Sequence, residues 1–179
     1  SEIPANVPYL RPDPALAAEW ARKLGPRDDA RRVGLIWSGN PAYGRHRRMT
    51  LAALKPLLET PGTKFYSLQK GPPAAELADM PDSGIIDHTA DLRDFSDTAA
   101  LMANLDLVIS VDTGPAHLAG ALGVPVWFML AFSADWRWML DRCDSPWYPT
   151  ARLFRQPSPR DWKSVVDSVR SALSNKRPV

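Results

Sequence analysis

One stretch, residues 107–121, limits more than any other what this chain can fold into. It opens with an apolar, β-branched run over residues 107–111, which has the composition of a strand buried on both faces. An Asp-Thr-Gly turn follows, and then a run rich in alanine and leucine that predicts a helix. Pro115 suits the first helical position, and Asp112 or Thr113 suits the N-cap. A buried strand that leads through a tight turn into a helix is typical of a parallel α/β sheet.

The start of that helix predicts an anion site. The free backbone N–H groups of Thr113 and Gly114 and the positive end of the helix dipole favour a phosphate. Asp112 would repel a phosphate, so we expect its carboxylate to accept backbone N–H bonds or to hold a sugar hydroxyl. His117 lies in the first turn, from which it could donate to a phosphate oxygen. The alternatives are ordinary helix capping for the turn and a packed first-turn position for His117.

The rest of the chain alternates short apolar runs with stretches of helical spacing. The apolar runs predict strands at residues 33–38, 64–69, 85–87, 124–130 and 151–155. Spacing and capping residues predict helices at residues 14–24, 51–58, 74–80, 95–105 and 162–173. This alternation predicts an α/β fold with a doubly wound, Rossmann-like parallel sheet of about six strands. In the usual order 3-2-1-4-5-6, ligands bind beyond the carboxyl ends of the first and fourth strands, where the order reverses.

That order brings a second segment to the same crevice. Ser38, Gly39 and Asn40 end the first predicted strand, and a basic run over residues 45–48 follows them. Arginine side chains bind phosphate oxygens through two parallel N–H bonds, so this run is a candidate phosphate ligand. The alternative is a solvated surface loop. Likewise, the segment Asp135–Trp138 either lines a pocket or packs over the sheet edge, and packing is favoured.

Composition excludes several classes of function. The net charge of +2 gives no field for nucleic acid, and no apolar run reaches the roughly 18 residues of a membrane span. A single cysteine, Cys143, suits a cytoplasmic protein. The sequence has no Walker-type phosphate loop, dinucleotide-binding fingerprint or serine nucleophile elbow. Its histidines lack the spacing of metal ligands, so we expect neither a metal nor a cofactor.

Two regions are predicted along the chain. Residues 1–30 combine a proline-rich strap with one helix, as expected of a linker from a missing N-terminal domain. Residues 31–179 contain the predicted sheet and form the ligand-binding domain. Within that domain, Trp37 and Trp127 occur inside strands and are predicted to be core residues.

The segment Ser110–Ala119 resembles the donor-site motif of the ADP-heptose heptosyltransferases, glycosyltransferase family 9. The wider pattern is most similar to a heptosyltransferase-type domain that follows tetratricopeptide repeats in some bacterial proteins. That pattern comprises residues 33–40, 67–71, 94–98, 135–138 and 145–149. The resemblance implies the GT-B architecture of two Rossmann-like domains, in which the C-terminal domain holds the nucleotide-sugar donor.

The resemblance also implies roles for individual residues. Thr113 and Gly114 would bind the donor diphosphate through backbone N–H groups, Asp112 would contact the sugar, and His117 would lie on the phosphate side. The family has a pair of hydroxyl residues after the first strand, whereas this chain has Ser38 followed by Gly39 and Asn40.

A basic residue of the following loop, Arg47 or Arg48, would neutralise the leaving diphosphate without a metal. Lys70 or Glu76 would approach the nucleoside.

By this resemblance the chain is the donor-binding half of a glycosyltransferase. The acceptor pocket and the general base would belong to an N-terminal acceptor domain, and tetratricopeptide repeats would belong to the same parent protein. No catalytic residue is therefore assigned in this chain, which alone should bind a nucleotide-sugar and transfer little. Two alternatives are a non-catalytic sugar-nucleotide recognition module and a GT-B-type sugar epimerase.

Overall fold

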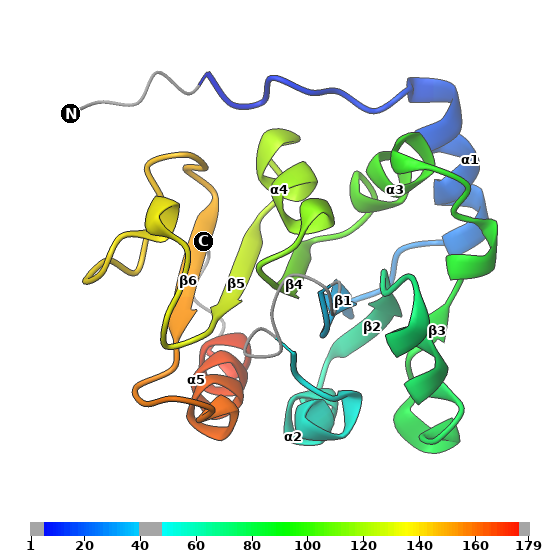
Figure 1. Cartoon of the computed structure of the whole chain (residues 1–179). Helices are drawn as coiled ribbons and strands as arrows, with labels where there is room; N and C mark the ends of the chain where they lie inside the picture. Colours follow the sequence, from blue (N-terminus) through cyan, green and yellow to red (C-terminus); the bar gives the residue numbers. More distant parts are fainter. Residues whose placement is uncertain (1–5, 40–47, 176–179) are drawn as a thin grey trace.

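The computed structural model describes residues 6–39 and 48–175, and it contains a six-stranded sheet in the order β3-β2-β1-β4-β5-β6 (Figure 1). All pairings between neighbouring strands of this sheet are parallel. The strands are β1 (Arg31–Ile36), β2 (Thr63–Ser67), β3 (Ile86–Asp87), β4 (Leu107–Val111), β5 (Val126–Leu130) and β6 (Ala151–Arg155). The predicted fold class and strand order are therefore confirmed.

Helices cover both faces of the sheet (Figure 1). On one face lie α1 (Pro14–Leu24), α3 (Phe95–Met102) and α4 (Gly114–Ala121), and on the other lie α2 (Lys55–Leu58) and α5 (Trp162–Ser174). Short 3-10 turns occupy the connections: η3 (Leu51–Leu54), η4 (Pro72–Leu77), η5 (Pro81–Ser83), η6 (Thr89–Asp91) and η7 (Trp136–Trp138). Within the described residues, no helix is both long enough and apolar enough to cross a bilayer.

The core consists of two apolar clusters, one on each face of the sheet. Successive strand residues point to opposite faces, so each central strand contributes to both clusters. In β4, Val108 belongs to the cluster under α3 and α4, whereas Leu107 and Ile109 belong to the cluster under α2 and α5. Trp37 and Trp127 are buried in the second cluster, as predicted from their positions in strand-like runs.

Three aspartates cap helices as the sequence predicts. Oδ1 of Asp13 accepts from the N–H of Leu16 at 2.9 Å, and Oδ1 of Asp161 accepts from the N–H of Ser164 at 3.0 Å. Asp94 accepts from the N–H groups of two residues in the first turn of α3, at 2.8 and 3.1 Å. These bonds satisfy N–H groups that have no partner inside the helix.

The predicted helix over residues 51–58 is helical over those bounds, but it is not one continuous α-helix. The segment forms the 3-10 turn η3 followed by a single α turn, α2. Pro56 lies in its middle and has no N–H to donate to the carbonyl four residues earlier, so a continuous α-helix cannot form. The predicted helix over residues 74–80 is likewise a 3-10 turn, η4, which begins at two successive prolines.

The proline-rich segment before α1 lies against the body of the molecule, as the sequence predicts. The N–H groups of Tyr9 and Leu10 both donate to the carbonyl of Ala121, at 3.1 and 3.2 Å. After this strap, α1 packs on α3 and buries Trp20 in the cluster beneath. The division of the chain into a linker and a domain at residue 31 stays a prediction.

An ion pair closes the start of α3. Asp97 is buried, and its carboxylate accepts from the side chain and the backbone N–H of Arg93 and from Trp20 of α1. The hydrogen bond from the Arg93 guanidinium is the largest cause that lowers the pKa of Asp97 to about 2. These contacts link α1 to α3 and hold α3 at one wall of the pocket described below.

We expect the free energy of unfolding of Asp97→Asn to depend less on pH in acid than that of wild type. The folded pKa of Asp97 is lower than its unfolded value, so its contribution is complete above about pH 4 and is lost as pH falls from about 4 to 2. The wild-type free energy of unfolding should fall more steeply over this range than that of the variant, and at pH 7 the variant should be about 1–3 kcal/mol less stable. Urea unfolding across pH measures both, with Asp167→Asn on the exposed face of α5 as the control. Parallel profiles for Asp97→Asn and wild type would contradict this expectation.

Candidate functional site

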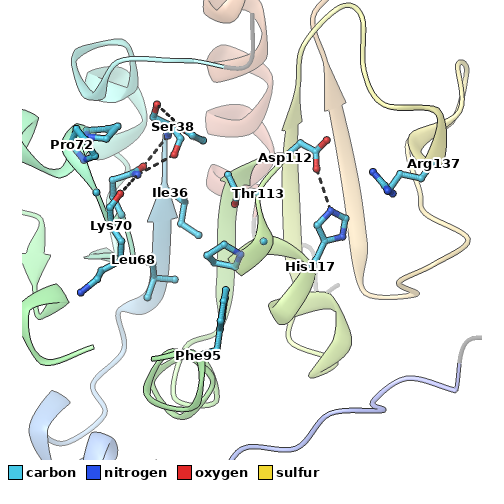
Figure 2. Close-up of a pocket in the computed structure, with 16 residues that line it drawn as sticks. Ile36, Ser38, Leu68, Lys70, Pro72, Phe95, Asp112, Thr113, His117 and Arg137 are labelled. Atoms are coloured by element: carbon cyan, nitrogen blue, oxygen red, sulfur yellow. Dashed lines mark hydrogen bonds and ion pairs between the residues drawn. The ribbon is translucent and has the colours of Figure 1, made fainter. Parts of the chain in front are cut away.

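A cavity of about 700 Å³ opens where the carboxyl ends of β1 and β4 meet (Figure 2). The parallel register pairs Ile36 with Ser110, so the residues that follow these strands emerge side by side. A side chain built at Gly39 would lie 3.5 Å from the methyl group of Thr113, which shows how closely the two segments approach. The predicted convergence of the two strand ends on one crevice is therefore confirmed for Ser38 and Gly39.

The turn from β4 into α4 forms the floor of this cavity. Thr113 occupies the N-cap position and its carbonyl accepts from the N–H groups of Ala116 and His117, but its hydroxyl makes no capping bond. The Thr113 hydroxyl instead lies 3.0 Å from Oγ of the buried Ser110. Helix α4 begins at Gly114, one residue earlier than the sequence predicts, which places Pro115 second.

Two N–H groups of this turn have no acceptor among the described residues. Within residues 6–39 and 48–175, no hydrogen bond is recorded for the backbone N–H of Thr113 or Gly114. Both residues line the cavity, and Gly114 brings no Cβ to it. The start of α4 therefore presents donors and a positive dipole end to the cavity.

The ring of His117 is fixed at both nitrogens. Its Nε2 lies 3.2 Å from Oδ1 of Asp112, and its Nδ1 lies 2.9 Å from the hydroxyl of Tyr148. The ring also stacks on the buried Trp138, at 5.4 Å between centroids and 20° between planes. Both Asp112 and His117 line the cavity, but the described contacts of the imidazole are with protein groups (Figure 2).

A buried amide holds the opposite wall. Oε1 of Gln69 accepts from the N–H groups of Trp37 and Ser38 at 3.0 and 2.9 Å, and its Nε2 donates to the carbonyls of Ser38 and Lys70 at 3.0 and 2.9 Å. Three of these bonds fasten the end of β1 to the segment after β2, and the fourth, to Lys70, braces that segment itself. They also explain why β2 ends at Ser67, two residues before the predicted strand end.

The cations predicted at the site are engaged elsewhere or lie outside the described residues. The amino group of Lys70 donates to the carbonyls of Thr89 and Leu92 at 2.8 and 2.9 Å, so it points away from Asp112 and His117 (Figure 2). Arg48 forms an ion pair with Glu76 at 3.5 Å, and neither residue lines the cavity. Asn40 and Arg47 lie outside the described residues, and their predicted roles stay predictions.

Arg137 is a cavity residue that the sequence did not single out. The segment Asp135–Trp138 was predicted to pack rather than to line a pocket, and it does both. Trp138 is buried, whereas Arg137 lines the cavity. The guanidinium is held by Asp135 at 2.8 Å and by the face of Trp136, 5.4 Å from the ring centroid. The carboxylate of Asp135, the N-cap of η7, and the ring of Trp136 therefore hold this cation at the rim of the cavity.

Phe95 is a second residue whose role the sequence missed. Helical spacing predicts it on the apolar face of its helix, yet its side chain is 60% exposed. It is the first residue of α3, at the edge of the sheet where the cavity opens, and it faces the Cα of Gly114. Ile36, Leu68 and Pro72 line the same cavity, so one wall is apolar. No group of residues suited to hold a metal ion occurs in the described part of the chain.

Comparisons with known proteins agree with this geometry. A sequence model of glycosyltransferase family 9 (heptosyltransferase) matches residues 92–134, which contain the turn from β4 into α4. Protein FlbA of Caulobacter vibrioides (strain ATCC 19089 / CIP 103742 / CB 15) is 34% identical over 181 residues, covering 96% of this chain. The chain spans 30% of the length of FlbA.

Two solved structures share the fold. The E. coli ADP-heptose lps heptosyltransferase II matches with a TM-score of 0.63 at 15% identity, over 92% of this chain and 53% of that one. The glycosyl transferase family 9 structure from Veillonella parvula DSM 2008 matches with a TM-score of 0.61 at 18% identity, over 95% and 46% of the two chains. The chain thus has a Rossmann-like fold that corresponds to about half of a GT-B glycosyltransferase.

We expect Gln69→Glu to destabilise the wall of the cavity. A carboxylate in place of the amide would face the carbonyls of Ser38 and Lys70 without a proton to donate, and the loss of two buried hydrogen bonds should cost about 2–4 kcal/mol. Urea unfolding measures the change.

Gln156→Glu is the matched control. Gln156 is equally buried, its Oε1 accepts from the N–H groups of Phe132 and Arg160, and no acceptor faces its Nε2 within the described residues. A carboxylate keeps both accepted bonds there, so the loss should be smaller. Equal losses for the two variants would show that the amide protons of Gln69 contribute nothing.

Proposed function

We propose that this chain binds the nucleotide-diphospho-sugar donor of a metal-independent glycosyltransferase, and that the parent protein transfers the sugar with the diphosphate as leaving group. The observation that carries the proposal is the pair of N–H groups at the start of α4, on the floor of the cavity, which have no acceptor within residues 6–39 and 48–175. Each hydrogen bond from such a donor to an ionised phosphate contributes about 1.5–3 kcal/mol. The helix dipole adds to the same attraction.

The two ends of the cavity suit the two ends of such a donor. The apolar wall of Leu68, Pro72 and Phe95 offers flat apolar contacts for a nucleobase on the side of Lys70. The other end holds the carboxylate of Asp112 beside His117. A carboxylate accepts hydrogen bonds from hydroxyl groups, so this end suits the sugar.

The sites for acceptor and general base are assigned to the part of the parent that this chain lacks. The chain covers about half of each solved structure that it matches. With the diphosphate at the α4 N-terminus, the sugar carbon that reacts would face outward, where a second domain would bring the acceptor. The isolated chain should therefore bind the donor and transfer little.

Isothermal titration calorimetry tests the proposal directly. The 179-residue chain is titrated with ADP, GDP, UDP and CDP, and then with ADP-glucose, GDP-mannose and UDP-glucose. At least one nucleoside diphosphate should bind without added metal and keep its affinity in EDTA. A chain that binds none of them has no donor site.

We expect Gly114→Ala to weaken nucleoside diphosphate binding by about tenfold or more without loss of stability. A Cβ at Gly114 would meet only the ring of Phe95, at an ordinary 3.7 Å, so the fold accepts it. The same methyl group would enter the cavity where the phosphate approaches the backbone. Calorimetry measures affinity, and urea unfolding measures stability.

Thr113→Ser is the control for this prediction, because it keeps the backbone N–H and the hydroxyl that faces Ser110. Its affinity should stay within about twofold of wild type. Undiminished binding by Gly114→Ala would mean that the ligand does not approach the start of α4.

We also expect Arg137→Gln to weaken nucleoside diphosphate binding by about three- to tenfold, because it removes a cation from the rim of the cavity. Arg142→Gln is the control. Arg142 lies in the same loop between β5 and β6, pairs with Asp144 at 2.8 Å and does not line the cavity. Calorimetry at two salt concentrations measures both variants. Equal losses in the two variants would assign the effect to overall charge rather than to contact.

A further inference from the structure

Tyr148 makes a contact with the site that the proposed function does not use. It precedes β6 in sequence and is buried, with 8% of its surface exposed. Its hydroxyl lies 2.9 Å from Nδ1 of His117, and His117 in turn lies 3.2 Å from Asp112 through Nε2. Three side chains therefore form one hydrogen-bonded series: Asp112 and His117 from the β4–α4 segment and Tyr148 from the loop before β6.

A glycine of α4 makes room for the tyrosine ring. A Cβ built on Gly120 would lie 2.5–2.8 Å from ring atoms of Tyr148, closer than any side chain tolerates. The ring thus lies directly on the backbone of α4, one turn after His117. Phe128 of β5 supports the ring in a stacked arrangement, with 6.4 Å between centroids. The position of the hydroxyl is fixed by packing on both sides.

The chemistry of the three groups assigns the protons between them. An ionised carboxylate only accepts hydrogen bonds, so Nε2 of His117 carries the proton that faces Asp112. In the neutral ring Nδ1 is then an acceptor, and the hydroxyl of Tyr148 is its donor. Burial is the largest cause that raises the pKa of Tyr148, so the hydroxyl keeps its proton.

We propose that Tyr148 is a positioning residue for the sugar end of the donor: its hydroxyl fixes the tautomer and orientation of His117, which holds the Asp112 carboxylate toward the cavity. The missing side chain of Gly120 leaves the space that the Tyr148 ring occupies. The inference rests on the proposed function, because it assigns Asp112 to a sugar hydroxyl. The inference treats sugar binding and diphosphate binding as separate, since the N–H groups of Thr113 and Gly114 hold the diphosphate without help from Tyr148, His117 or Asp112.

Paired calorimetry on Tyr148→Phe tests the inference. The probes are ADP with ADP-glucose and UDP with UDP-glucose, and the quantity compared is the gain in affinity that the sugar adds to the nucleoside diphosphate. Wild type should show such a gain for at least one pair. In the variant, the ratio of the affinity for the nucleotide-sugar to the affinity for the nucleoside diphosphate should be about five- to tenfold smaller, while the affinity for ADP or UDP alone stays unchanged.

Two further variants separate positioning from loss of structure. Tyr66→Phe removes the hydroxyl of another buried tyrosine, one that does not line the cavity, and should leave every affinity unchanged. Gly120→Ala should displace the Tyr148 ring and reproduce the selective loss by a different route. If Gly120→Ala fails to fold, Tyr148→Phe remains the test.

Nitrogen-15 NMR of the imidazole rings reads the tautomer without any ligand. Wild type should show the signature of a His117 ring protonated at Nε2, and Tyr148→Phe should show that signature averaged toward a mixture. Tyr66→Phe should match wild type.

Several outcomes overturn the inference: unchanged sugar gain in Tyr148→Phe, an equal loss for sugar-bearing and sugar-free probes, or a wild type that gains nothing from the sugar. If wild type binds no nucleotide, the proposed function fails by itself. In that case the NMR spectrum decides the positioning role separately. An unchanged His117 spectrum in Tyr148→Phe overturns that role, and a changed spectrum shows that Tyr148 still positions His117 and Asp112.

Discussion

The lateral pairing of β1 with β4 is the constraint on which the site depends. These strands are distant in sequence but parallel neighbours in the sheet, with Ile36 opposite Ser110. The sheet order reverses between them, so the connections leave on opposite faces and a crevice opens at their carboxyl ends. The amide of Gln69 then holds one wall of that crevice, because it fastens the end of β1 to the segment after β2 through three hydrogen bonds. Without this register, Gly39 and Thr113 would not meet.

The architecture is predictable from the sequence because the patterns that mark its strands, turns and helix caps are local. An apolar β-branched run, a turn and a capped helix identify each strand–helix unit, and the parallel alternation leaves few strand orders. Aspartates at 13, 94 and 161 cap the helices that follow them. The errors occurred where a proline overrode helical spacing, as at Pro56. The predicted second strand also extends through Leu68 and Gln69, but only Leu68 still donates to β1 from its backbone, and at Gln69 the side chain takes over the bonds to β1.

The site was only partly predictable, because several of its residues act through contacts that leave no pattern. Gln69 bonds to groups more than thirty residues away, and Tyr148 reaches His117 across a similar separation. Phe95 follows the helical spacing of a core residue, and only its place at the first position of α3 turns it into the cavity. Arg137 lies between two tryptophans, which favoured packing for the whole segment.

The distribution of charge in the cavity bears on what kind of recognition it can perform. Lys70 is occupied by two carbonyls, Arg137 is held by Asp135, and His117 is bonded at both nitrogens. Lys70 would have to give up its two carbonyl partners before it could bind a ligand, whereas Arg137 can attract an anion at the rim while it stays paired with Asp135. Backbone N–H groups need no such exchange, because they are fixed in direction by α4. Affinity for an anion then depends first on the shape of one turn and second on Arg137, and selectivity depends on the neutral and carboxylate groups around them.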